Sequence, residues 1–170
     1  MNTAGIVQVP DPVLRARCLE VTEFDKDFRE FAARLCSAAW EAGRVGVAAP
    51  QIGVALRAFA AKVDDTQSPR LFVNPRLKAT DGTQTGREGC LSVAERWFVL
   101  TRANWVRVSA QDVAGEWFEV ESEGLGARAL QHEIDHLDGV LVIDRAREQL
   151  RGLPRQQRRA IERELAKVRP

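Results

Sequence analysis

The stretch His-Glu-Ile-Asp-His at residues 132–136 constrains the fold of this chain more than any other feature. Two histidines four residues apart lie on one face of an α-helix, because four residues make just over one turn. The flanking residues are largely apolar, which predicts a buried helix: Ala127, Ala129, Leu130, Ile134 and Leu137. Two buried imidazoles need polar partners, because an unpartnered buried polar group is costly. The chain is therefore expected to fold around this helix, with one divalent metal shared by His132 and His136.

The residue between these histidines adds a mechanism to the pattern. Glu133 lies about 100° further round the helix than His132 and is close enough to reach a metal-bound water. An H-E-x-x-H helix is typical of metallohydrolases, in which the glutamate acts as general base. The alternative is a surface amphipathic helix that matches by chance, and the apolar flanks argue against it.

Length and charge restrict the class of protein. A chain of 170 residues is expected to form a single domain, residues 1–170, with a substantial core. The net charge of +1 predicts no general attraction to nucleic acid or membrane, and therefore no specific DNA partner. No apolar run approaches the ~20 residues of a membrane span. The N-terminal residues lack the pattern of a signal peptide, and three cysteines make no disulfide framework, so a cytoplasmic location is expected.

The periodicity of apolar residues predicts an α+β fold, with mostly antiparallel strands around the central metal-binding helix and a helix near each end. The expected helices are 26–41, capped by Asp25 and stopped near Gly43, then 125–137 and a basic helix at about 154–168. The expected strands are 56–63, 71–73, 105–108, 117–120 and 140–143, with a turn at Gly115. Residues 1–24 are expected to be irregular, because Pro10 and Pro12 break any helix.

A catalytic metal site usually has a third protein ligand, and the chain has no third histidine. The downstream carboxylates fall in what is expected to be an exposed basic helix: Glu148, Glu162 and Glu164. Cys90 is the better candidate, because a thiolate is a strong ligand and Gly89 permits a tight backbone beside it. The alternative is that Cys90 is a small buried hydrophobe, as most free cysteines are. Spacing alone leaves the two interpretations open.

A run of small residues, Gly46 to Pro50, precedes Gln51. Small residues let backbones approach closely, and the amide of Gln51 can donate to an oxyanion. Taken alone, this segment is equally typical of a packing device followed by a solvated loop glutamine.

Together, these three segments resemble the peptide deformylase family, which carries G-x-G-x-A-A-x-Q, E-G-C-x-S and H-E-x-x-H in that order. The chain has Val-Gly-Val-Ala-Ala-Pro-Gln at 45–51, Glu-Gly-Cys-Leu-Ser at 88–92 and Gln-His-Glu-Ile-Asp-His at 131–136. The N-terminal Pro-Asp-Pro-Val-Leu, the Asn74-Pro75 pair and the Leu-Asp-Gly-Val-Leu after the metal helix are also similar to the family. The resemblance therefore covers nearly the whole chain.

The resemblance implies a reaction: hydrolysis of the N-formyl group of N-formylmethionyl nascent peptides, which releases formate. It implies one divalent metal per chain, expected to be iron(II), with zinc, nickel or cobalt able to substitute. The implied ligands are Cys90, His132 and His136, with water in the fourth position. Glu133 would take a proton from that water and pass it to the leaving amine. Gln51 and the backbone N–H of Leu91 would hold the developing oxyanion.

The chain departs from the family pattern beside the substrate. Arg44 replaces the first glycine of the Gly-rich segment, and Ala94 follows the cysteine motif where the family often has proline. Trp97 and Phe98 would reshape the pocket for the methionine side chain, or simply pack in the core or a strand. The residues predicted to bind substrate are Arg44, Val45, Gly46, Glu88, Gly89 and Trp97.

Two charged features are further candidates. Glu88 is expected to hold a ligand imidazole through its N–H, and Arg102 to pair with Glu88 or Asp135 or else to be ordinary surface charge. Residues 145–170 carry nine Lys or Arg against three Glu. This excess predicts either a solvated helix face or docking to the ribosome through phosphate contacts.

Three alternative functions remain open from the sequence. One is a deformylase-like hydrolase with another N-formylated substrate, and one is a general zinc peptidase, against which the absence of a third histidine argues. The last is a non-catalytic ribosome-binding homologue, against which the intact set of candidate catalytic residues argues.

Overall fold

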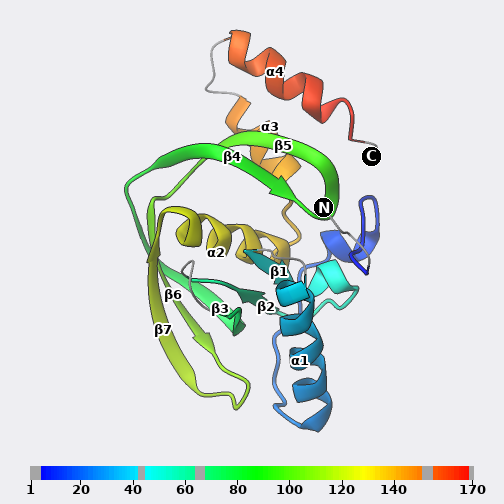
Figure 1. Cartoon of the computed structure of the whole chain (residues 1–170), viewed down its shortest axis with the longest axis vertical. Coiled ribbons are helices and arrows are strands. Elements are labelled where there is room, and N and C mark those ends of the chain that lie inside the picture. The colour runs from blue at the N-terminus through cyan, green and yellow to red at the C-terminus, as the bar shows by residue number, and fades with distance from the viewer. Residues whose placement is uncertain (1–4, 42–44, 64–67, 151–154, 169–170) are drawn as a thin grey trace.

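The fold is described from a computed structural model, shown in Figure 1. It describes residues 5–41, 45–63, 68–150 and 155–168. The α-helices are α1 (Lys26–Glu41), α2 (Gly124–Leu137), α3 (Val142–Gln149) and α4 (Arg155–Leu165). The strands are β1 (Gly46–Ala48), β2 (Ala58–Ala61), β3 (Arg70–Asp81), β4 (Gln84–Cys90), β5 (Val93–Arg102), β6 (Trp105–Gln111) and β7 (Trp117–Glu123). Two short 3-10 helices are η1 (Pro12–Arg15) and η2 (Ala49–Ile52).

The strands form two antiparallel sheets, one on either side of α2. A five-stranded sheet has the order β1-β2-β3-β6-β7, and β4 pairs with β5 in a separate hairpin. In Figure 1 the hairpin curves over α2 while the larger sheet lies beneath it. The predicted α+β class, with antiparallel strands around a central helix, is confirmed.

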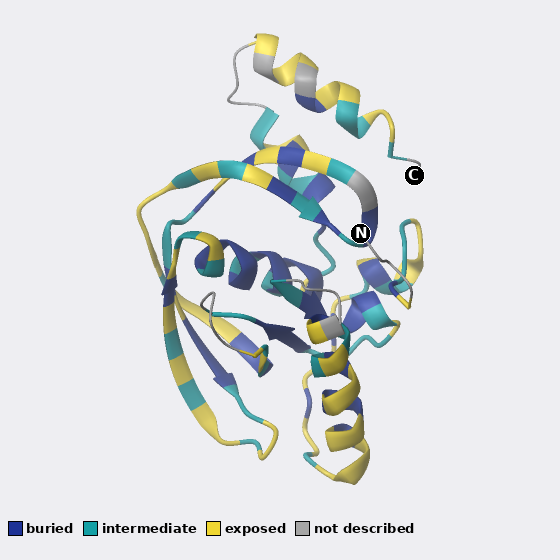
Figure 2. Ribbon diagram, viewed as in Figure 1, coloured by how far each residue is buried: buried dark blue, intermediate teal, exposed yellow. Residues whose placement is uncertain are grey.

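Three apolar clusters fix these layers. Phe59 and Phe72 stack at 4.7 Å between ring centroids and pack with Leu130 of α2, which attaches the helix to the large sheet. A second cluster joins α1 to β1 and β2, and a third joins the hairpin to α3 and α4. Figure 2 shows the result: α2 is largely buried, whereas α1 has one exposed face. The metal-motif helix therefore lies at the centre of the molecule.

The predicted helix at 26–41 is confirmed as α1. Its cap is also confirmed, because Asp25 Oδ1 accepts a hydrogen bond from the Phe28 N–H at 2.9 Å. The predicted stop at Gly43 lies outside the described residues. The turn at Gly115 is present, with φ +87°.

Two sequence predictions about local structure are wrong. The run 140–143 is not a strand, because Val142 begins α3 and the Leu141 N–H donates to Asp144 Oδ2 at 2.8 Å, which caps that helix. A four-residue apolar run fits a buried helix end as well as a strand. The segment 1–24 is not wholly irregular either, because Pro12 starts η1, where its missing N–H costs nothing.

Strand lengths were predicted less well than helices. Strand β2 is shorter than the predicted 56–63, β3 is much longer than 71–73, and β1, β4 and β5 were not predicted at all. No helix in the described part of the chain is long and apolar enough to cross a membrane.

Candidate metal centre

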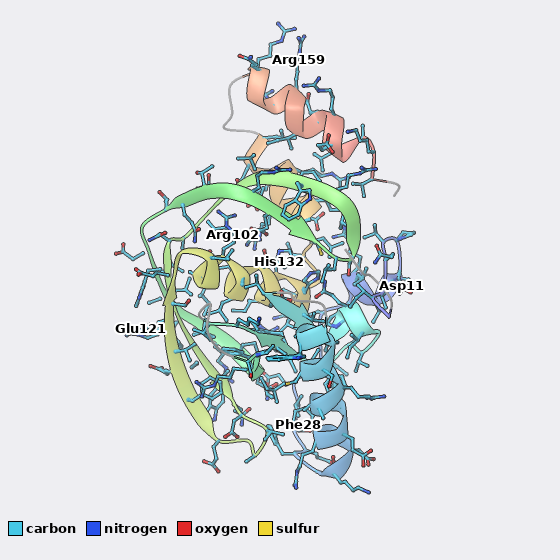
Figure 3. The ribbon with its side chains drawn as sticks, in the orientation of Figure 1. Asp11, Phe28, Arg102, Glu121, His132 and Arg159 are labelled. Atoms are coloured by element: carbon cyan, nitrogen blue, oxygen red, sulfur yellow. The ribbon has the colours of Figure 1, made fainter. Side chains whose placement is uncertain are left out.

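Cys90, His132 and His136 meet at one point between the hairpin and the helix. Their ligand atoms all lie within 4.8 Å of one another, and Cys90 Sγ is 3.3 Å from His136 Nε2. Cys90 ends β4, and the two histidines are one turn apart on α2, with ring centroids 4.9 Å apart. Figure 3 shows His132 on the side of α2 that faces the hairpin. The structure thus brings together the three residues predicted as ligands.

The donor set fits a divalent metal. His132 Nδ1 lies 2.7 Å from Glu88 Oε1, which leaves its Nε2 to face the cluster. One thiolate and two imidazoles make a common N/S donor set, and three protein ligands are typical of a catalytic site. Within the described residues, the buried side-chain atoms without a hydrogen-bond partner are His136 Nδ1 and Glu133 Oε2, and both belong to this site.

The electrostatics favour a thiolate at Cys90. Burial opposes ionisation, but the imidazoles of His136 and His132 outweigh it and hold the pKa of the Cys90 thiol well below its ordinary value. Burial also opposes protonation of His132, yet its contacts with Cys90 and Glu88 raise its pKa. A bound cation would take the place of the positive charge that these contacts stabilise.

Glu88 is the buried anion behind this cluster. It accepts hydrogen bonds from His132 Nδ1, from Arg102 Nε at 3.0 Å and Nη2 at 2.6 Å, and from Arg128 Nη1 at 2.9 Å. Burial alone would raise the pKa of Glu88, but His132 and Arg102 lower it far below the usual range. The expected contact between Glu88 and a ligand imidazole is present.

Arg102 is not surface charge. It is 8% exposed and bridges Glu88 to Asp135, whose Oδ2 accepts from Arg102 Nη1 at 2.6 Å. Arg145 donates to the other oxygen of Asp135 at 2.5 Å. The buried carboxylates of Glu88 and Asp135 are therefore both paired with arginines, and Figure 3 places Arg102 beside α2.

Glu133 lies against β1. A Cβ added to Gly46 would come within 2.6 Å of Glu133 Oε1, so the carboxylate occupies the space that a side chain would need. Burial raises the pKa of Glu133 above its ordinary value, although His132 and His136 oppose the shift. A carboxylate with a raised pKa is suited to accept and return a proton near neutral pH.

Gln51 is buried and oriented, so the solvated-loop alternative is wrong. Its Oε1 accepts a hydrogen bond from the Ala48 N–H at 2.9 Å. The amide nitrogen is consequently turned toward the metal cluster, 3.7 Å from Cys90 Sγ and 3.4 Å from Ser92 Oγ. A donor held this way needs little reorganisation to meet a developing negative charge.

A cavity of about 360 Å³ opens beside the cluster. Every residue predicted to bind substrate lines it except Arg44, which lies outside the described residues: Val45, Gly46, Glu88, Gly89 and Trp97, together with Leu91 and Gln51. Trp97 is 41% exposed and pairs with Gly89 across the hairpin, whereas Phe98 is buried in the core. Core packing is therefore confirmed for Phe98, whereas Trp97 packs in strand β5 against Gly89 and also lines the cavity.

The sequence prediction missed four residues that also line the cavity: Arg87, Leu125, Arg128 and Ala129. Three of them precede His132 on α2 by three, four and seven positions. That spacing places them on the helix face of His132, which is a signal that was available in the sequence.

Comparisons with known proteins agree with this geometry. The profile of the polypeptide deformylase family matches residues 3–151. The chain is 41% identical over 148 residues to a peptide deformylase of Acidobacterium capsulatum, covering 85% of this chain and 87% of that protein. It is 40% identical over 145 residues to one of Clostridium botulinum, covering 85% and 97%.

The chain belongs to the peptide deformylase family. The crystal structure of a peptide deformylase from Legionella pneumophila superposes with a TM-score of 0.80 at 37% identity, covering 95% of this chain and 92% of that one. A Thermotoga maritima peptide deformylase gives 0.77 at 40% identity, covering 82% and 95%. The family consists of metal-dependent hydrolases, and the Cys90, His132 and His136 group could hold the metal.

Proposed function

We propose that this peptide deformylase homologue removes the formyl group from N-formylmethionyl nascent peptides and releases formate. The observation that supports this is the cluster of Cys90, His132 and His136, with the Gln51 amide nitrogen 3.7 Å from Cys90 Sγ and with Glu133 lining the adjacent cavity. These groups are the parts that hydrolysis of an amide requires.

Cys90, His132 and His136 would hold one divalent metal, iron(II) in the cell, with zinc, nickel or cobalt able to replace it. When bound, the metal would supply Lewis acidity, which polarises the formyl carbonyl and lowers the pKa of water toward neutral pH. Glu133 accepts the proton of the attacking water and returns it to the leaving amine nitrogen. The Gln51 Nε2–H and the Leu91 backbone N–H donate to the oxygen on which negative charge develops.

In this proposal, the cavity holds the methionine side chain. Val45 and Gly46, from the segment that leads into β1, and Gly89 with Trp97, from the hairpin, line this cavity. The peptide is proposed to bind along them, with Arg44, which lies outside the described residues, as a further substrate contact. Glu88 acts through His132, because the hydrogen bond at Nδ1 fixes the imidazole and leaves Nε2 as the atom that would bind the metal.

The decisive experiment measures formate release from formyl-Met-Ala-Ser by protein purified anaerobically and loaded with iron(II). Wild-type turnover should fall at least 10³-fold in Glu133→Gln and about 10²–10³-fold in Gln51→Leu. Glu148→Gln, an exposed carboxylate, is the matched control and should retain activity. Absence of turnover by wild-type protein that carries one metal per chain would contradict the proposal.

We also propose a cytoplasmic location and a ribosome contact through α4. The helix carries exposed arginines, among them Arg155, Arg159 and Arg163, and Figure 3 shows Arg159 projecting away from the body. Ile161 attaches the opposite side of α4 to the hairpin cluster. The basic side is therefore available to phosphates while the helix stays folded.

Replacing Arg155, Arg159 and Arg163 by Gln tests this contact without exposing the core. Co-sedimentation with ribosomes should weaken, and its dependence on salt concentration should become less steep. A control with Lys26, Arg34 and Lys78 changed to Gln removes equal charge elsewhere. Equal loss in both variants would contradict a specific role for α4.

A further inference from the structure

The cavity wall contains a buried cation that no step of the proposed reaction uses. Arg128 is 5% exposed and lines the cavity. It precedes His132 by four residues on α2, so the two side chains lie on one face, about one helical turn apart. Most of the remaining wall is apolar, with Val45, Leu91 and Leu125 among its members.

Glu88 connects Arg128 to the metal cluster. Its Oε1 lies 2.7 Å from His132 Nδ1, and its Oε2 accepts from Arg128 Nη1 at 2.9 Å. Because one carboxylate bridges both groups, the guanidinium lies just beyond the imidazole. Glu88 also pairs with Arg102, so its single negative charge is shared between two guanidinium groups.

Arg128, which lines the cavity, has one donor, Nε, that none of its hydrogen bonds within the described part of the chain uses. Its Nη2 donates to the carbonyl oxygens of Leu100 at 3.3 Å and Gln84 at 3.4 Å. Gly86 makes room for the group, because a Cβ there would lie 3.3 Å from Arg128 Nη2.

We propose that Arg128 determines specificity for the first side chain of the formylated peptide and favours a chain that ends in a hydrogen-bond acceptor. This inference rests on the proposed function, which places the formyl group at the cluster and the side chain in the cavity. Arg128 lies about one helical turn, ~5.4 Å along the helix axis, from His132, which is comparable to the length of a methionine side chain. A purely apolar side chain seated in the cavity would shield the Arg128 Nε–H from water without supplying an acceptor, which is costly.

The most discriminating pair of substrates differs only near the far end of the first side chain. Norleucine has the shape of methionine without an acceptor, whereas methionine sulfoxide carries a strong acceptor oxygen on sulfur. Arg128 is expected to favour the sulfoxide over norleucine, with methionine between them. A hydrogen bond to a charged group corresponds to about tenfold or more in kcat/KM.

The test compares kcat/KM for Ala-Ser tripeptides that begin with formyl-Met, formyl-norleucine and formyl-methionine sulfoxide. The sulfoxide-to-norleucine ratio of the wild type should be about ten or more, and Arg128→Leu should lower it toward one. Arg107→Leu removes an exposed arginine on β6, paired with Glu121 and absent from the cavity lining, and should leave the ratio unchanged. Calorimetric binding of the corresponding deformylated peptides should show the same order without catalysis.

The outcomes separate the two proposals. Turnover of the formyl-Met peptide with a wild-type ratio at or below one would overturn the role of Arg128 and leave the proposed function standing. Turnover of none of the peptides would overturn the proposed function. If Arg128→Leu does not fold, Arg128→Lys keeps the charge with fewer donors, and its ratio must still fall. An unchanged ratio in a folded Arg128 variant would also overturn the inference.

Discussion

Gly46 is where the absence of a side chain has the most direct consequence for chemistry. A Cβ atom added at Gly46 would lie only 2.6 Å from Glu133 Oε1. The glycine therefore determines where the proposed general base lies relative to the metal ligands. Its neighbours Val47 and Ala48 are fully buried, so the strand cannot move aside.

Gly46→Ala is expected to displace Glu133 and lower kcat about 10²-fold, because a misplacement of about 1 Å can cost that much. Metal content should stay at one per chain, because no ligand is touched. Combined with Glu133→Gln, the substitution should add little further loss, since both act on one group. Full activity of Gly46→Ala would show that the carboxylate position is not critical.

Cys18 offers a pH-dependent effect away from the active site. Burial raises the pKa of its thiol from 9.0 to about 11; Arg57 opposes the shift and Asp138 adds to it. Between these values the folded chain keeps a proton that the unfolded chain loses. The stabilising contribution is thus present below pH 9 and is lost as pH rises toward 11.

Between pH 8 and pH 10.5, the free energy of unfolding should fall in the metal-free wild type. This fall should be about 2 kcal/mol larger than the fall in metal-free Cys18→Ala. Urea unfolding at both pH values measures the difference. The chain has no tyrosine, which removes one competing titration. Parallel pH dependences of the two proteins would contradict the assignment.

At the scale of elements, α2 packs tightly against the end of β7 and the Val63 backbone at Gly126. A Cβ there would overlap the Ser122 hydroxyl and the carbonyl oxygen of Val63. The contact with Val63 is to backbone, which cannot rotate away. This close approach seats the start of α2 on the large sheet and sets the depth of the histidines that follow.

Helix propensity alone predicts that Gly126→Ala stabilises the protein by about 1 kcal/mol. We expect the opposite sign, a loss of about 2 kcal/mol or more, because of overlap with a fixed carbonyl. Thermal or urea unfolding decides between them. Leu125→Ala, at an exposed neighbouring position, is the comparison and should change stability far less.

The sequence predicted the elements that have a clear local periodicity, and it missed those that are defined only by pairing with another strand. Helix α1 has a regular apolar stripe and a cap, and it was predicted at its observed bounds. Strand β4 reads Gln-Thr-Gly-Arg-Glu-Gly-Cys, without the alternation that marks a half-buried strand, and only its pairing with β5 defines it. The run at 140–143 was mistaken for a strand because nothing local excludes either structure.

The same distinction holds for the candidate site. His132, Glu133 and His136 follow from helical spacing alone. Cys90 required the resemblance, since proximity to the histidines depends on how the hairpin lies over α2. The orientation of Gln51 by the Ala48 N–H, and the burial of Arg128 beside Glu88, arise from tertiary contacts that no local pattern contains.

For the whole molecule, the proposed metal connects two layers. Cys90 belongs to the hairpin, and the histidines belong to the helix that is attached to the other sheet. A ligand that binds only the folded chain raises stability by about 2.7 kcal/mol at 100 times its Kd. Metal should therefore strengthen the attachment between layers.

Adding zinc or nickel to metal-free protein is expected to raise its Tm, and a chelator should reverse the rise. Cys90→Ala should lose most of this gain, because it leaves two histidines on a single helix. Cys36→Ala, which changes a cysteine outside the cluster, should keep it. An equal rise in Cys90→Ala would show that the hairpin does not take part.

The distance along the chain between the ligands also imposes an order on assembly. His132 and His136 become neighbours as soon as one turn of helix forms, whereas Cys90 lies 46 positions before His136. A partly folded chain that has formed this helix therefore offers a cation two ligands, and Cys90 becomes the third only when the hairpin packs over the helix. The rate at which a chelator removes the metal therefore reports whether the tertiary structure is complete, and this measurement requires no substrate.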